Sequence, residues 1–444
     1  MGLFSSLNRE QKESIGLLQI GTFLEYFDLM LYVHMAVFLN ELFFPKTDPH
    51  TASLLAAFAL CSTLGFRPIG ALIFGQIGDR IGRKSTIIIT TSMMAISCIV
   101  MANLPTYAQI GIAAAWIMIF CRIAQGISSM GELIGAQIYL TESTYRPTSY
   151  PIVASLAISA GLGGVVALGV AVLVTSFSDL NWRFAFWIGA AIAIVGAIAR
   201  TRLRETPDFL EMKRQRLKKE IEQTNLEADA LLGVDEGARS NATWKEPVRG
   251  KTLISYFLIQ CGYPLCFYLA FLYFNPLLNK NFGYSTEDII KHNFFLSTMS
   301  LVFSILLTSV SCYIHPIKIL KIKGTLFLFV MVFLPFLIVN STSSIQLFFI
   351  QASILLLILG TVPADAVFLT HFPLYRRFTY ASFLFSIAHA LMYAIISFGL
   401  VYLGSYFGHF GLWFITLPIA VAYLSGVYHF KGLERKLGMY PNLS

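Results

Sequence analysis

Charged residues are scarce in this sequence. Only 13% of its 444 residues are Asp, Glu, Lys or Arg, whereas 56% are hydrophobic. A soluble domain carries about 25% charged residues, so this scarcity excludes a soluble globular protein. The sequence also begins without a short apolar stretch that leads to a small-residue cleavage site, and the first apolar segment is therefore expected to remain in the protein.

Motifs for metals, disulfides and nucleotides are lacking as well. The six cysteines are scattered among apolar segments without a CxxC pair, so we expect packing residues rather than ligands or disulfide partners. No GxxxxGK[ST] loop occurs, which argues against ATP-driven transport. The sequence shows no nucleophile–base constellation, and we expect no enzyme, no metal site and no cofactor.

Long apolar runs are abundant. Each run of about 20 residues can cross a hydrocarbon core about 30 Å thick as an α-helix that satisfies its own backbone groups. We therefore predict an all-α membrane protein of about twelve spanning helices. Their expected ranges are 15–40, 52–78, 86–104, 108–142, 150–176, 183–203, 253–278, 293–314, 322–340, 344–368, 379–403 and 410–430.

One long polar stretch, residues 204–252, interrupts the apolar runs. It contains EMKRQRLKKEIEQTNLEADALL, which predicts a charged, amphipathic helix. This linker separates two halves of about six spans each, at residues 1–203 and 253–444.

Lys and Arg gather in alternate loops. One such loop holds Lys318, Lys321 and Lys323, whereas LPTY at 104–107 and NSTSS at 340–344 hold no base. Basic residues concentrate on the cytoplasmic side of membrane proteins, so we expect both termini and the linker to be cytoplasmic. The formal charge of +8 then reflects topology and contact with an anionic lipid surface, and no nucleic-acid partner is expected.

The loop between the second and third spans carries the most specific motif. The stretch GFRPIGALIFGQIGDRIGRK covers residues 65–84 and fits the pattern G-x-x-x-D-R-x-G-R-[RK]. Glycines permit a tight turn and close helix approach. Asp79 can accept hydrogen bonds from a helix N-terminus or pair with a base. The matching residues are Gly75, Gly78, Asp79, Arg80, Gly82, Arg83 and Lys84.

This loop resembles the signature of the major facilitator superfamily. Further segments are similar to its metabolite:proton symporters, which carry proline, betaines, citrate, dicarboxylates or α-ketoglutarate. These segments are GTFLEYFDLMLY, LPTYAQIGI, RIAQGISSMGELIGAQIYLTE and WRFAFWIG…RTRLRETPDF. The resemblance covers the first half to about residue 210. It is weak in the second half, where CYIHPIKILKIKG has no Asp and FPLYRRFTYASF is a loose counterpart. It implies a major facilitator fold, alternating access, a proton gradient as energy source and a bacterial inner membrane.

Two acids lie within the first span. Around the helix, Asp28 lies about 60° and Tyr32 about 20° from Glu25, so the three share a face. An acid in mid-membrane costs at least about 2.5–3.5 kcal/mol. Such acids are tolerable if they face an aqueous cavity, hold a proton or pair with a base.

The fourth span supplies a base. Arg122, Gln125, Ser129 and Glu132 form a stripe about 80° wide, which we expect to line a cavity. Arg122 can bind a substrate carboxylate or pair with Glu25 or Asp28, and it is the only Arg or Lys expected near that depth. We expect Glu132 to load and release a proton, because burial disfavours its charged form.

Further candidates lie at the span ends and in the second half. Glu142, Arg146 and Glu205 can join the Asp-Arg loop in an ion-pair cluster that closes the inner gate in the outward-facing state. Asp365 and His389 are the candidates in the second half, although a lone buried histidine is more often a core residue than a switch.

The sequence therefore predicts a proton-coupled importer of a small polar metabolite. Its expected partners are that solute, protons and the lipid bilayer. The solute is either a zwitterion such as proline or a betaine, or an organic carboxylate. A proton-antiport exporter of the same fold and a non-transporting membrane receptor remain as alternatives.

Overall fold

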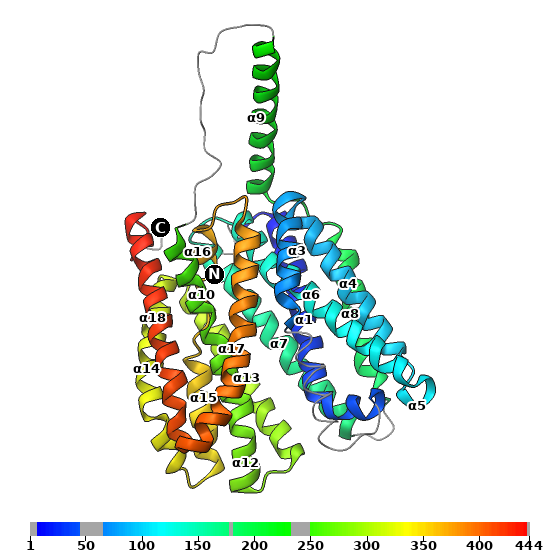
Figure 1. Cartoon of the computed structure of the whole chain (residues 1–444), viewed down its shortest axis with the longest axis vertical. Coiled ribbons are helices and arrows are strands. Elements are labelled where there is room, and N and C mark those ends of the chain that lie inside the picture. The colour runs from blue at the N-terminus through cyan, green and yellow to red at the C-terminus, as the bar shows by residue number, and fades with distance from the viewer. Residues whose placement is uncertain (1–6, 45–64, 177–180, 232–248, 442–444) are drawn as a thin grey trace.

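The computed structural model describes residues 7–44, 65–176, 181–231 and 249–441. These residues form a bundle of long helices (Figure 1). Each of the twelve predicted segments contains helix. Seven stretches of the described residues are long and apolar enough to cross a membrane, and one of them, 377–436, contains two helices. Residues 52–64, in the predicted second span, lie outside the described residues.

The described residues of the first half form six long helices and one short one. The short helix α5 (Tyr107–Ile110) directly precedes the long apolar helix Ile112–Ser143. The six long helices are α1 (Arg9–Phe43), α3 (Arg67–Arg80), α4 (Arg83–Asn103), α6 (Ile112–Ser143), α7 (Ser149–Ser176) and α8 (Arg183–Arg200).

The described part of the second half contains two interrupted spans. Its first span is built from four consecutive pieces, α10 (Gly250–Gln260), α11 (Gly262–Phe267), the π-helix η1 (Tyr268–Tyr273) and α12 (Phe274–Phe282). The remaining elements are α13 (Thr286–Val310), α14 (Pro316–Val339), α15 (Ser344–Leu356), α16 (Asp365–Thr370), α17 (Arg377–Phe407), the 3-10 helix η2 (Gly408–Leu412) and α18 (Trp413–Lys436).

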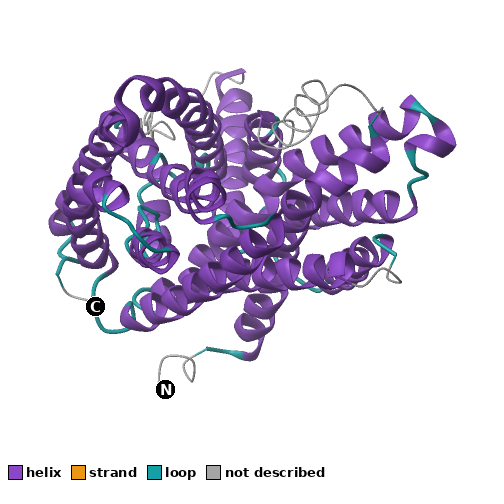
Figure 2. Cartoon of the chain, turned by 90° about the horizontal axis from the view of Figure 1, so that it is seen from below, coloured by secondary structure: helices purple, strands orange, loops and turns teal. Residues whose placement is uncertain are grey.

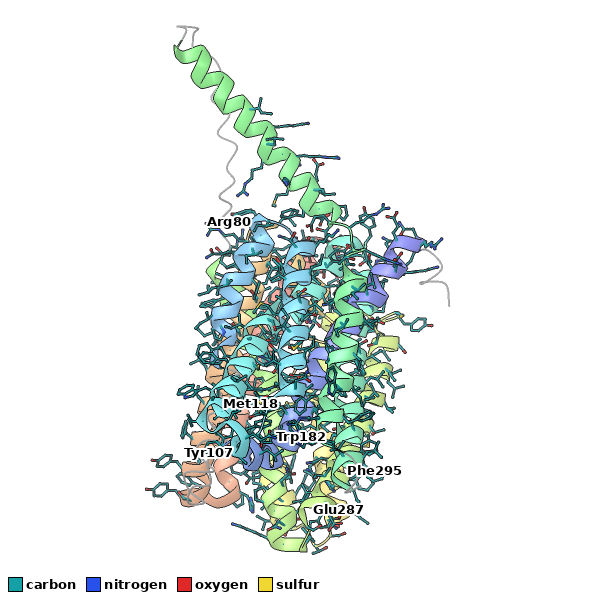
Figure 3. The ribbon with its side chains drawn as sticks, turned by 90° about the vertical axis from the view of Figure 1, so that its right-hand side faces the viewer. Arg80, Tyr107, Met118, Trp182, Glu287 and Phe295 are labelled. Carbon is teal, nitrogen blue, oxygen red and sulfur yellow. The ribbon has the colours of Figure 1, made fainter. Side chains whose placement is uncertain are left out.

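The predicted charged helix is present as α9 (Pro207–Leu231). Its Lys, Arg, Glu, Gln and Leu residues are good helix formers, and Asp208 in its first turn suits the positive end of the helix. This helix projects beyond the bundle (Figures 1 and 3). We call the end of the bundle from which it projects the linker end.

The most extensive contacts between the two halves are those of α3 with α17 and of α7 with α13, and α6 and α7 also contact α16. Figure 2 shows the helices of the bundle from below. Small residues allow the close approach of α3 and α17, because a Cβ added at Gly75 would lie 2.8 Å from the Cα of Thr379. The Gly75 and Gly78 of the sequence motif therefore serve the contact between halves.

Two predicted spans of the second half are not continuous helices. The predicted helix 344–368 ends at Leu356, and helix resumes only at Asp365. Gly360 and Pro363 lie in this gap; glycine weakens a helix, and proline removes a backbone donor. The predicted helix 253–278 is likewise interrupted at Cys261 and in η1. Irregular backbone at membrane depth is tolerated where it is buried in protein or lines a cavity.

Candidate functional site

Arg122 lies in a fully buried cluster between α1 and α6. Its Nη1 donates to Asp28 Oδ2 at 3.0 Å and to Gln125 Oε1 at 2.7 Å. Its guanidinium stacks over the ring of Tyr32, 4.0 Å from the ring centroid. The expected pairing of Arg122 with an acid of the first span is therefore present, and Asp28 is the partner.

Glu25 has a different partner. The Nη2 of Arg67, at the start of α3, lies 3.5 Å from Glu25 Oε1. Glu25 Oε2 is buried and makes no hydrogen bond among the described residues. The expectation that Arg122 is the only base at this depth is therefore wrong, because Arg67 reaches the same face of α1 from a neighbouring helix.

Glu132 pairs with a third arginine. Its carboxylate accepts from Arg200 Nη1 and from the hydroxyls of Thr90 and Thr91. Arg200 ends α8 and is fully buried. Ser129, one turn before Glu132, donates to the carbonyl of Gly126 in its own helix at 2.9 Å.

A cavity of about 440 Å³ lies between the two halves. Residues of α1, α6 and α7 line it from the first half, and residues of α10–α17 line it from the second. Its polar lining includes Gln137, Gln260, Lys323, Asp365 and His389. His389 Nδ1 is hydrogen-bonded to the carbonyl of Phe385 at 2.9 Å, and its ring stacks on the Phe385 ring.

The predicted stripe of α6 does not line this cavity. Arg122, Gln125, Ser129 and Glu132 are buried but are absent from its lining. Neighbouring helices α1, α4 and α8 supply the partners of three of them, so the charged groups are enclosed within the first half. The cavity meets α6 one residue later, at Leu133, and again at Gln137.

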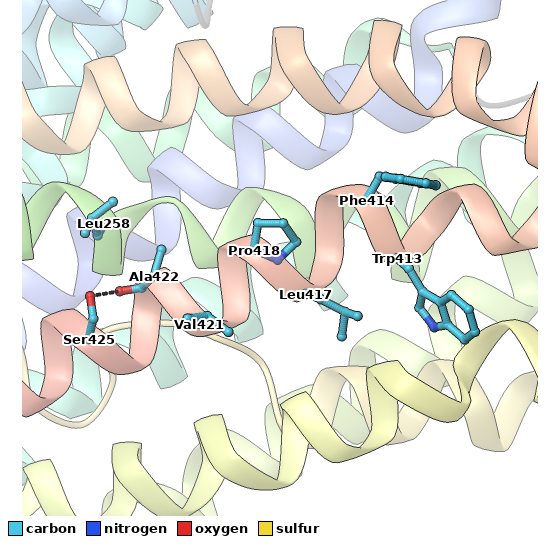
Figure 4. Close-up of a pocket in the computed structure, with 8 residues that line it drawn as sticks. All are labelled: Leu258, Trp413, Phe414, Leu417, Pro418, Val421, Ala422 and Ser425. Atoms are coloured by element: carbon cyan, nitrogen blue, oxygen red, sulfur yellow. Dashed lines mark hydrogen bonds between the residues drawn. The ribbon is translucent and has the colours of Figure 1, made fainter.

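A second hollow, on the face of α10 and α18, has no charge in its lining (Figure 4). Its lining includes Leu258 of α10 and Ser425 of α18. The Ser425 hydroxyl donates to the carbonyl of Ala422 at 2.9 Å. A polar solute would find no ion partner there. Within the described residues, no group of three or more His, Cys, Asp or Glu side chains could hold a metal ion.

Asp79 caps the start of α17 from across the interface between halves. Its carboxylate accepts from the backbone N–H groups of Phe378 (3.1 Å) and Thr379 (2.9 Å) and from the Thr379 hydroxyl (2.8 Å). An anion at a helix N-terminus satisfies free donors and complements the helix dipole. Arg83 Nη1 lies 3.2 Å from the same carboxylate and keeps it paired.

Glu142 joins both halves at the same level. Its buried carboxylate accepts from Arg83 of the first half (3.1 Å) and from Arg377 of the second half (3.1 Å). The Thr206 hydroxyl donates to it at 2.7 Å. Arg83 also donates to the carbonyl of Leu374 at 2.9 Å. Asp79, Arg83 and Glu142 thus form the linker-end latch with α17.

Two other residues of the predicted gate, Glu205 and Arg80, make no ion pair in this latch within the described residues. Glu205 Oε1 accepts from the backbone N–H of Arg83 at 2.9 Å and caps the start of α4. Burial raises the pKa of Glu205 above its ordinary value, although these backbone hydrogen bonds oppose the rise. Arg80 is exposed at the end of α3.

Arg146 belongs to a second latch that sequence reasoning missed. Its Nη1 lies 3.1 Å from the fully buried Oε2 of Glu434, on α18. His371 Nε2 lies 2.7 Å from Glu434 Oε1, and His315 Nε2 lies 3.6 Å from Oε2. His315 Nδ1 accepts from the N–H of Ile317, so its ring proton faces Glu434. An acid from α18 thus stands where the second half lacks the motif Asp.

We expect Asp79→Asn to slow turnover at least about tenfold while substrate affinity changes less than about threefold. The substitution weakens a charge-assisted cap worth about 1.5–3 kcal/mol, and Asp79 does not line the cavity. Turnover and equilibrium binding should be measured separately. Asp208→Asn is the matched control, because that half-exposed carboxylate lies 3.9 Å from Arg377. A collapse of affinity with unchanged turnover would show that Asp79 is not a gate residue.

Comparison with known proteins agrees with this architecture. The pattern of the Major Facilitator Superfamily matches residues 18–364, which is more than half of the chain. The chain belongs to the major facilitator superfamily. Proteins of this family are membrane transporters and not enzymes. The chain is accordingly an integral membrane protein.

Two curated bacterial transport proteins are similar to this chain in sequence. The proline/betaine transporter of Salmonella typhimurium is 29% identical over 282 residues, covering 62% of this chain and 54% of that protein. The inner membrane metabolite transport protein YhjE of Escherichia coli is 35% identical over 216 residues, covering 46% and 48%. The chain thus spans about half the length of these curated relatives.

Solved structures share the fold over nearly the whole chain. A proton:xylose symporter, XylE, bound to 6-bromo-6-deoxy-D-glucose superposes with a TM-score of 0.72 at 17% identity, covering 96% of this chain and 95% of that one. The human organic anion transporter MFSD10 gives a TM-score of 0.65 at 15% identity, with 95% and 100% covered. At these identities the likeness concerns the fold alone.

Proposed function

We propose that the chain is a secondary transporter that imports a small polar metabolite together with protons by alternating access. One observation carries this proposal. The cavity lies between the halves, while the hydrogen bonds and ion pairs that join the halves gather at the linker end. A central cavity closed at one end by contacts that can break is what alternating access requires.

The orientation follows from the basic loops. The excess of Lys and Arg at the linker end supports a cytoplasmic location for that end. The two latches then close the cytoplasmic side, and the solute enters from outside. We place the chain in a bacterial inner membrane, which the name of the Escherichia coli relative supports.

Among the intramembrane acids of the first half, Glu25 is the best suited to carry the proton. Asp28 has Arg122 at 3.0 Å, and Glu132 has Arg200 and two hydroxyls. Glu25 has a single cation at 3.5 Å and one buried oxygen without a partner. Protonation of Glu25 therefore sacrifices the least stabilisation of the anion. The proton gradient is the energy source, and no cofactor is required.

The proposed substrate belongs to one of two classes, a zwitterion such as proline or a betaine, or an organic carboxylate. The printed names of the relatives support the first class. A volume of about 440 Å³ lies within the usual range of small-molecule sites, about 300–1,000 Å³. The cavity also holds both signs of charge, with Lys323 and Asp365 in its lining.

The direction of solute flux under an imposed proton gradient tests this function. Purified protein in liposomes with α9 inside should accumulate labelled glycine betaine, L-proline or citrate when the outside is acidic. Collapse of the gradient with a protonophore should stop accumulation. Solute expulsion under the same gradient would instead identify an antiport exporter. Binding without any flux would identify a non-transporting receptor.

A further inference from the structure

The cavity is lined by the two interrupted spans of the second half. Gln260 and Tyr263 flank the break at Cys261, while Thr361 lies in the gap between α15 and α16 and Asp365 begins α16. Discontinuous helices in transporters mark sites where backbone is allowed to leave helical form because it faces a ligand or water. The second half, which departs most from the family pattern, therefore forms the polar wall of the cavity.

Lys323 stands in this wall without an ion partner. It lies on α14, is 5% exposed and lines the cavity. Its Nζ makes no hydrogen bond among the described residues. A buried ammonium is costly unless an anion or several acceptors reach it. The sequence placed Lys323 in a basic loop, and this placement is wrong because α14 begins at Pro316.

Asp365 presents the complementary charge. It is 4% exposed, begins α16 and lines the same cavity. Its Oδ2 is buried and has no hydrogen-bond partner among the described residues. No ion pair within 4.0 Å joins Asp365 to Lys323 in the described part of the chain. The cavity thus holds one unpaired cation and one unpaired anion.

Arg122 does not reach the cavity in this state. Its guanidinium is fully buried, bound to Asp28 and Gln125, stacked on Tyr32 and outside the cavity lining. Arg67 is absent from that lining as well. Among the described residues that line the cavity, Lys323 is the only Lys or Arg and Asp365 is the only acid.

We propose that Lys323 binds the carboxylate of the substrate and Asp365 binds its positively charged nitrogen. The inference rests on the proposed function and selects the zwitterion from its two substrate classes. A di- or tricarboxylate would satisfy Lys323 but place its remaining negative charge in the same cavity as Asp365. A zwitterion satisfies both groups and leaves no net charge buried.

We call Lys323 and Asp365 the two charged poles of the cavity. Matched ligands test both poles with wild-type protein. Glycine betaine can be compared with choline, which lacks the carboxylate, and with 3,3-dimethylbutanoate, which lacks the charged nitrogen. L-Proline, pyrrolidine and cyclopentanecarboxylate form a second series. We expect at least one zwitterion to bind at least about 30-fold more tightly than both of its analogues, because each analogue leaves one buried charge unpaired. Equilibrium binding to detergent-solubilised protein measures this without a proton gradient.

Variants assign each pole to its residue. Lys323→Met should reduce the preference for the zwitterion over the analogue without carboxylate to less than about threefold. Asp365→Asn should reduce the preference for the zwitterion over the analogue without charged nitrogen to less than about threefold. Lys323→Arg should retain much of the preference. Lys318→Met is the matched control, because Lys318 is exposed on the same helix and should leave all affinities unchanged.

The outcomes separate this inference from the proposed function. Wild-type protein that binds citrate but neither zwitterion overturns the inference, even if citrate uptake is proton-driven. Unchanged ligand preference in folded Lys323→Met also overturns it. If either variant fails to fold, the wild-type ligand series decides, since equal binding of a zwitterion and its analogues contradicts two charged poles. Selective zwitterion binding without proton-driven uptake supports the poles and refutes the transport mechanism.

Discussion

Arg122→Ala is expected to abolish transport while the protein remains inserted in the membrane. The substitution leaves Asp28 as a buried carboxylate without its cation, and breaking a buried ion pair costs about 3–5 kcal/mol. It also removes the guanidinium from the ring of Tyr32 and from Gln125. The cluster that fixes α1 against α6 is lost, so both the uptake rate and the thermal midpoint of unfolding should fall.

Three further variants interpret this loss. Arg122→Lys keeps the charge but cannot reproduce the planar contact with Tyr32, and partial activity is expected. The double variant Arg122→Ala, Asp28→Asn removes both charges and should recover most of the stability without recovering transport. Arg202→Ala is the control, because Arg202 is exposed. Arg122→Ala that transports at the wild-type rate would reduce the cluster to a packing element.

Glu25→Gln is expected to abolish accumulation driven by a pH gradient while exchange of internal for external substrate continues. Glutamine retains the shape of the protonated acid but cannot release a proton. The Arg67–Glu25 pair is longer, at 3.5 Å, than the Arg122–Asp28 pair, at 3.0 Å. Loss of the Glu25 charge should therefore cost less folding stability than the Arg122 substitution. Labelled uptake with and without an imposed gradient, and counterflow at equal pH, measure the two activities.

The other buried acids serve as comparisons for Glu25→Gln. Asp28→Asn should impair counterflow as well, because it leaves Arg122 without its anion. Glu132→Gln should lower the thermal midpoint, since it weakens the bonds from Arg200, Thr90 and Thr91. Gradient-driven accumulation that survives Glu25→Gln but fails in an otherwise stable Glu132→Gln protein would move the proton site to Glu132.

The spans could be predicted because apolar run length alone determines whether a helix can cross a membrane. The interruptions were harder to predict. Gly360 and Pro363 lie within a run whose hydropathy is as high as that of a continuous helix, and hydropathy does not register a missing backbone donor. The start of α14 was placed six residues late for a related reason. Its first turn is basic, yet Pro316 at the first position and His315 as a cap begin the helix there.

Residues on one helix were predicted more reliably than their partners. The angle between Arg122 and Gln125 follows from the helical repeat, and the two side chains do bond. Asp28 was one of two candidates on its face. The pairs of Arg67 with Glu25, Arg200 with Glu132 and Glu434 with Arg146 join separate helices. A single sequence gives the face of each residue but not the neighbour that this face meets.

Glu434 illustrates the same limit at the linker end. In the sequence it stands among the bases of KGLERK, where an acid reads as an ordinary surface residue. In the fold it is fully buried against Arg146, His371 and His315. The one available signal was that the loop CYIHPIKILKIKG lacks the Asp of the first-half motif, so an acid for this end of the second half could be sought on another helix.

The central claim is that solute and proton enter together through the cavity between the halves. The most direct measurement follows external pH in weakly buffered vesicles with α9 inside, when glycine betaine or L-proline is added without an imposed gradient. We expect the external medium to become more alkaline as the solute enters, and Glu25→Gln vesicles to give no such change. Acidification of the medium during uptake, or uptake by the wild type with constant pH, would contradict it.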